Sequence, residues 1–142
     1  MDNVLVIIVI VGVCLWYFGK KDPNKTIEDL ESRAYWLYNM SLEKSDNPII
    51  YNITEDDEIR LKKTEESYIR LKEKFKHDTK KIIEVVIDWR DYCLEMHHKV
   101  LEWKKFGVNL ESDADKEFED GIKNSELVMS EIEKRFEKLL VI

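Results

Sequence analysis

The sequence predicts an all-α protein in which an N-terminal single transmembrane helix precedes an antiparallel helical hairpin, or coiled-coil bundle, with one long central helix. Only 4 Gly and 2 Pro occur in 142 residues, too few for the many tight turns of a sandwich, a barrel or a doubly wound sheet. Charged residues make up 37% of the chain, and apolar residues recur at helical spacing over long stretches. This length corresponds to one domain plus its ends.

The first element is an uncharged apolar run from Val4 to Phe18, which we interpret as a retained membrane anchor over residues 4–19. It is slightly shorter than the usual span of about 17–25 residues. Aromatic residues end the run, as in an interfacial belt, and lysines that can snorkel follow. These anchor residues are Trp16, Tyr17, Lys20 and Lys21. A cleaved signal peptide or a lipoprotein lipidated at Cys14 fits less well, because the small residues of a cleavage site are missing.

The flanking charges predict the orientation of this anchor. No Lys or Arg precedes the run, whereas Lys20, Lys21 and Lys25 follow it closely. Positive residues tend to stay on the cytoplasmic side, so residues 1–3 would be a short extracytoplasmic N-terminus. We therefore expect a single-pass membrane protein with the bulk of its chain in the cytoplasm.

Gly19 and Pro23 predict a hinge over residues 20–25, after which residues 26–142 form the helical coiled-coil domain. Thr26 resembles an N-cap, and apolar residues then recur at alternating spacings of 3 and 4. This pattern predicts a first amphipathic helix over about 27–44.

The second predicted helix is unusually long. Thr54 and Asp57 give a capping signal, and neither Gly nor Pro interrupts the chain from Glu55 to Phe106. Apolar residues recur every seven positions, and we call these the seam residues: Leu61, Tyr68, Phe75, Ile82, Trp89, Met96 and Trp103. The pattern predicts one helix over 55–106, about 75 Å long, ending at Gly107. Asp78 and Lys99 interrupt the offset row of the pattern, where buried polar residues often fix register or partner choice.

The third predicted helix covers about 114–140. Its apolar residues alternate at spacings of 4 and 3 after a capping signal at residues 112–115. The short connection from the second helix predicts an antiparallel arrangement, with Leu139–Ile142 opposite Ile82–Ile87.

The apolar arc of the second helix widens after Ile82, to roughly 200°. We call the added residues the broad face: Val86, Ile87, Cys93, Leu94, Val100 and Leu101. One neighbouring helix covers only about half of such an arc, so a second neighbour is needed. Either the first helix packs along this half, or a partner protein or second copy does. The sequence favours the partner, because a folded-back first helix would reach only about Phe75.

The stretch 60–81 is basic, with nine Lys/Arg against four Asp/Glu, although the whole chain carries a formal charge of -7. These residues are Arg60, Lys62, Lys63, Arg70, Lys72, Lys74, Lys76, Lys80 and Lys81. A basic helix can face anionic lipid. The alternative, which the sequence favours, is a solvated face paired with acids of the other helices.

Few parts of an active site are visible. A net acidic chain is a poor nucleic-acid binder, and no phosphate loop, hydrolase elbow or paired-cysteine motif occurs. Glu95 and His98 match half of a di-metal bundle signature, and Cys93 and His97 lie one helical turn apart. Two ligands do not make a site, so we expect no metal, no cofactor and no enzymatic activity.

The sequence thus predicts a membrane-anchored coiled-coil scaffold, adaptor or assembly factor that binds lipid and a protein partner, or itself, through helix 55–106. The alternative is a membrane-tethered effector or inhibitor of viral or phage type, acting in lysis or exclusion, with its helical domain facing outward. No family resemblance accompanies either prediction.

Overall fold

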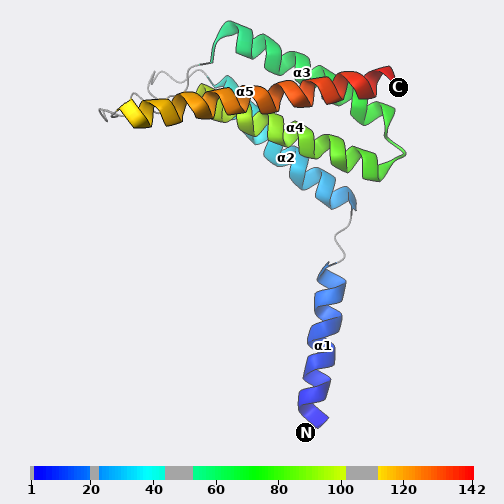
Figure 1. Ribbon diagram of the computed structural model, residues 1–142. Helices are drawn as coiled ribbons and strands as arrows, with labels where there is room; N and C mark the ends of the chain where they lie inside the picture. The colour runs from blue at the N-terminus through cyan, green and yellow to red at the C-terminus, as the bar shows by residue number, and fades with distance from the viewer. Residues whose placement is uncertain (1, 20–22, 44–52, 102–111) are drawn as a thin grey trace.

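A computed structural model of the protein describes residues 2–19, 23–43, 53–101 and 112–142, and all regular structure in these ranges is helical. The helices are α1 (Asp2–Gly19), α2 (Pro23–Leu42), α3 (Glu55–Lys74), α4 (Thr79–Val100) and α5 (Ser112–Val141). Helices α2 to α5 form a bundle, and α1 extends away from it (Figure 1). The all-helical bundle predicted from the composition is confirmed.

The bundle is organised around α4, which packs against α2, α3 and α5, while α3 also packs against α5. Helices α2 and α4 run in one direction, and α3 and α5 run in the opposite direction (Figure 1). Each helix is therefore antiparallel to the one that follows it along the chain. This alternation of direction is that of an up-and-down bundle, but the most extensive packing joins the parallel helices α2 and α4.

The single helix predicted over 55–106 is wrong, because the chain turns between α3 and α4. The Phe75 N–H donates to the Leu71 carbonyl at 3.0 Å, which closes the end of α3, and the Asp78 N–H donates to the Phe75 carbonyl at 2.8 Å. Asp78 then caps α4, since its side chain accepts a hydrogen bond from the Lys81 N–H at 3.1 Å. The predicted register or partner role of Asp78 is replaced by this N-cap.

The hairpin brings together residues that a continuous helix would hold far apart. Tyr68 of α3 and Trp89 of α4 stack with their ring centroids 5.3 Å apart. Twenty-one residues of straight helix would separate these side chains by about 31 Å. The heptad pattern continues across the turn because both helices direct their seam residues to one core.

The core of the described chain draws on α2, α3, α4 and α5. Trp89 is its largest fully buried side chain, followed by Tyr68, Tyr92 and Phe136. Helix α2 contributes Ala34 and Leu37, which are also buried. Because α2 lies along α4, one chain supplies the second neighbour that the width of the apolar arc requires.

Several helix ends differ from the prediction. Helix α2 begins at Pro23, inside the predicted hinge, so Thr26 lies within the helix and is not its N-cap. Proline suits the first helical position, where its missing N–H costs nothing. Helix α4 ends at Val100, with Leu101 as its C-cap, and Gly107 lies outside the described residues. The Thr54 N-cap is confirmed, since Thr54 Oγ1 accepts from the Asp57 N–H at 3.1 Å.

The predicted transmembrane segment corresponds to α1. Among the helices in the described ranges, none combines the length and the apolarity required to cross a membrane. The transmembrane part of the predicted fold is therefore unsupported.

Candidate functional site

Helix α1 exposes its aliphatic side chains on every side. The eight consecutive residues from Val4 to Val11 are all more than half exposed, between 51% and 69%. Eight residues make more than two helical turns, so these side chains cover the whole circumference of the helix. No extensive packing joins α1 to another described helix. The apolar surface of α1 is thus not covered by the bundle and can contact lipid or another protein.

The anchor residues predicted to follow this run cannot be placed at the level of side chains. Trp16 and Tyr17 lie in α1, but their side chains are outside what the structure describes. Lys20 and Lys21 lie outside the described residues altogether.

The predicted partner interface lies largely inside this chain. Three residues of the broad face are buried: Val86, Cys93 and Val100. The other three, Ile87, Leu94 and Leu101, are partly buried. The width of the apolar arc is therefore explained by α2 and no longer argues for a second chain at this face.

The basic stretch is divided by the turn and lies mostly on α3. Lys72 pairs with Glu31 of α2 at 2.6 Å, and Arg60 pairs with two acids of α5. Three further lysines pair locally: Lys62 with Glu58, Lys76 with Glu73, and Lys81 with Glu84. Lys63, Arg70 and Lys80 are exposed. Two of these bases, Lys72 and Arg60, thus contact acids of the first and third predicted helices, in line with the solvated-face alternative.

A network of charged side chains crosses α3, α4 and α5. The Lys99 ammonium lies 2.7 Å from Asp57 Oδ1 and also contacts Glu126. Glu126 in turn accepts from Arg60 Nη1 at 2.6 Å, and Arg60 Nε donates to Glu133 at 2.5 Å. Tyr92 Oη donates to the same Glu133 carboxylate at 2.9 Å. Lys99, in the offset row of the heptad pattern, is therefore part of an ion-pair network that links three helices.

Burial and pairing act in opposite directions on the pKa values in this network. Burial alone would lower the pKa of Lys99, but the hydrogen bonds to Asp57 and Glu126 raise it overall. Burial alone would raise the pKa of Glu126, but the hydrogen bonds from Lys99 and Arg60 lower it overall. Both shifts favour the charged forms, so Lys99 and Glu126 stay ionised near neutral pH.

The weak metal candidates do not gather into a site. Cys93 is fully buried in the core, where burial raises the pKa of its thiol. Glu95 accepts a hydrogen bond from Ser125 at 2.7 Å, and its carboxylate is 3.9 Å from His98 Nδ1. The His97 ring lies 6.4 Å from the Trp36 ring. In the described part of the chain, no group of three or more His, Cys, Asp or Glu side chains could hold a metal ion.

An aromatic cluster that the sequence pattern does not predict surrounds Trp89. Tyr35 and Tyr38 of α2 lie 6.0 Å and 5.9 Å from its ring, and Tyr92 stacks on it at 6.0 Å. Tyr68 closes the cluster, and its hydroxyl donates to Glu31 of α2 at 2.5 Å. Tyr35 and Tyr38 lie beside the seam of the first predicted helix. The cluster becomes apparent only when α2 is placed along α4.

Comparison with family models, with curated proteins and with solved structures found no match for this chain.

Proposed function

We propose that this protein is a membrane-anchored helical scaffold or adaptor, in which α1 inserts into a bilayer and the bundle stands at its cytoplasmic surface. The role is non-enzymatic: the bundle binds a protein partner, and the lipid holds it in place. The observation that carries this proposal is the continuous apolar exterior of α1 over Val4 to Val11, with every side chain more than half exposed.

This exterior favours lipid over another helix as the environment of α1. An amphipathic helix that packs on one partner keeps a polar face toward water, whereas a helix that is apolar all round is surrounded by protein or lipid. The run from Val4 to Phe18 is about 22 Å long at 1.5 Å per residue, against a hydrocarbon core of about 30 Å. A short helix is accommodated by local thinning of the bilayer and by flanking residues that reach its interface.

The bundle supports the second half of the proposal. Its core is closed within the described chain, and ion pairs join α3 to α2, α4 and α5. A closed bundle on a short tether presents fixed helix faces near the membrane, which is what a scaffold requires.

The membrane anchor is tested by alkaline carbonate extraction of membranes from cells that express the full chain with a C-terminal tag. We expect the wild-type protein to stay in the pellet and Ile8→Lys to move to the supernatant. A lysine near the centre of a membrane helix costs about 2.5–3.5 kcal/mol, or about a hundredfold in partitioning. Leu127→Lys is the matched control, because Leu127 of α5 and Ile8 are both 64% exposed. Wild-type protein in the supernatant would overturn the proposal.

The orientation needs a separate readout. A C-terminal reporter that works only in the cytoplasm should be active, because the lysines after α1 favour the cytoplasmic side. Activity restricted to a reporter that works on the far side would reverse the orientation. It would then favour a tethered effector or inhibitor of viral or phage type.

A further inference from the structure

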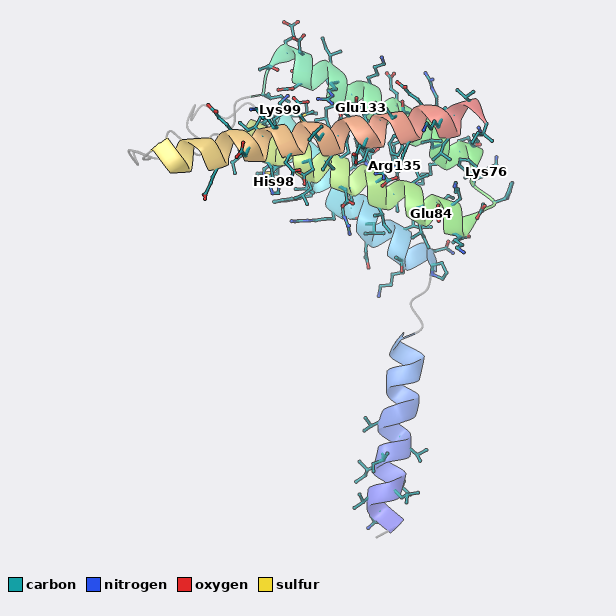
Figure 2. All side chains as sticks on the ribbon, viewed as in Figure 1. Lys76, Glu84, His98, Lys99, Glu133 and Arg135 are labelled. Atoms are coloured by element: carbon teal, nitrogen blue, oxygen red, sulfur yellow. The ribbon has the colours of Figure 1, made fainter. Side chains whose placement is uncertain are left out.

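Three segments that are distant in the sequence meet at one end of the bundle. The Lys74 ammonium at the end of α3 donates to the Leu139 carbonyl near the end of α5, at 2.6 Å. A groove at the same end is lined by Ile27 of α2, Ile69 of α3 and Ile82 of α4. Figure 2 shows Lys76 and Glu84 toward this end and Lys99 and His98 toward the other. We call the surface formed by residues 24–27, 69–82 and 139–142 the tether end.

The tether end is the end at which the bundle joins α1. Helix α2 begins there at Pro23, and α1 ends at Gly19. If α1 inserts into a bilayer, the intervening residues can span only about 10–14 Å even when fully extended. The tether end is therefore the part of the bundle that the anchor holds closest to the lipid headgroups.

The charge of the tether end is opposite to that of the whole chain. Residues 72–81 contain five lysines and a histidine against two acids, whereas the chain as a whole carries a formal charge of -7. Three of these lysines pair with acids, Lys72 with Glu31 of α2, Lys76 with Glu73 and Lys81 with Glu84. One of the two acids, Asp78, caps α4. Lys80 is exposed, and the paired Lys76 keeps 55% of its side chain exposed.

Apolar side chains lie among these bases. Phe75 is flanked by the ammonium groups of Lys74 and Lys81, at 5.6 Å and 5.9 Å from its ring centroid. Ile69 is 51% exposed and Val141 is 87% exposed. Bases with apolar neighbours are typical of surfaces that enter the headgroup region of a membrane, where the lysines meet phosphates and the apolar groups leave water.

From this arrangement, we propose that the tether end docks onto anionic lipid headgroups, so that the bundle rests on the membrane through its α3–α4 turn. The inference rests on the proposed insertion of α1, which holds this end near the surface. Attraction of basic residues to an anionic leaflet falls off within a Debye length, so only the end that is held close benefits from it.

The test uses the full chain reconstituted in vesicles of phosphatidylcholine alone and in vesicles that also contain phosphatidylglycerol. Flotation of the vesicles reports insertion of α1, and amide hydrogen exchange of residues 75–81 reports docking of the tether end. We expect the protein to float with both kinds of vesicle. Exchange should be slowed by about fivefold or more in the anionic vesicles only, and high salt should abolish that protection.

Matched variants separate docking from general attraction. Lys76→Gln/Lys80→Gln should lose the protection, while Lys62→Gln/Lys63→Gln should keep it, because the latter lysines lie near the middle of α3, about three helical turns before its end at Lys74. All four side chains are exposed, so both variants should keep the helical circular dichroism of the wild type.

Each outcome bears on one of the two proposals or on both. Flotation with both vesicles but equal exchange overturns the docking, as does an equal loss of protection in the two variants. Flotation with anionic vesicles alone, lost in high salt, overturns insertion of α1; protection of residues 75–81 in those vesicles then supports docking by charge alone, and its absence overturns the docking as well. Absence of flotation with either vesicle overturns both.

Discussion

For Lys99, the heptad pattern predicts the burial of the side chain correctly but does not identify its partners. Its position in the repeat predicts that its side chain is buried, and only 19% of that side chain is exposed. The sequence could not identify its partners, because Asp57 and Glu126 lie 42 and 27 residues away in the chain. Partners at such a separation depend on the topology, and here the topology depends on the turn before α4.

Substitution of Lys99 should destabilise the bundle. In Lys99→Ala, the Asp57 carboxylate, which is only 10% exposed, loses the ammonium that it contacts at 2.7 Å. A buried acceptor left without its partner costs about 1–3 kcal/mol, which chemical denaturation followed by circular dichroism would measure. Lys62→Ala is the control, since its pair with Glu58 is solvent-exposed and contributes about 0.3–0.5 kcal/mol. Equal losses in both variants would contradict the role assigned to the network.

The buried tyrosines predict instability in alkali. Burial raises the pKa of Tyr68 and Tyr92 above the ordinary value near 10, with the nearby acids Glu31 and Glu133 adding to the shift. The same causes raise the pKa of Tyr38 to about 12, with Glu65 as its acidic neighbour. The folded state therefore keeps these phenols neutral when the unfolded state has ionised them.

The sign of the effect follows from this difference. The contribution of these tyrosines to stability is fully present below pH 10 and is lost as the pH rises through their folded-state pKa values. In that range the unfolded chain binds fewer protons than the folded chain. Each fully buried tyrosine contributes a slope of about 1.4 kcal/mol per pH unit. Tyrosinate absorbance should therefore appear together with the loss of helical circular dichroism. Titration of all six tyrosines near pH 10 with the helices intact would contradict the burial of Tyr68 and Tyr92.

At the scale of elements, α3 and α4 show that a heptad pattern does not distinguish one long helix from two shorter ones. A repeat that stays in phase through Leu71 and Ile82 is equally compatible with one helix and with two helices that face one core. The absence of Gly and Pro favoured one helix. The informative signal was the widening of the apolar arc at Ile82, which coincides with the start of α4. Helix α3 lies at the edge of the bundle, whereas α4 contacts three neighbours and needs a wider apolar surface.

The cap of α4 can be tested at the turn itself. Asp78→Ala removes the carboxylate that accepts from the Lys81 N–H and should lower the free energy of unfolding by about 1 kcal/mol. Asp78→Asn keeps an acceptor and should cost much less. In a continuous helix the ranking would reverse, because Ala is the better residue in a helix interior. Denaturant midpoints of the two variants distinguish these cases.

At the scale of the whole molecule, the turn converts an open rod into a closed bundle. In the predicted rod over 55–106, the broad face requires a partner helix, and the basic stretch occupies the first half. In the bundle, α2 covers most of the broad face, and the lysines of residues 72–81 lie at the end that joins α1. The composition and the capping signals were sufficient to predict helices, but the packing of α2 along α4 is a long-range feature that neither contains.

The bundle in the proposed scaffold and the tether end both depend on the turn between α3 and α4. A distance between spin labels at residues 55 and 98 tests this turn most directly. The labels are introduced as Glu55→Cys and His98→Cys in a Cys14→Ser background. The Cys93 thiol is kept, since it is buried and burial raises its pKa, so it should not react. The contact between Asp57 and Lys99 places these helix ends side by side, so we expect about 20–30 Å between the labels, including their arms. A distribution centred near 65 Å would mean a continuous helix and would contradict the turn between α3 and α4.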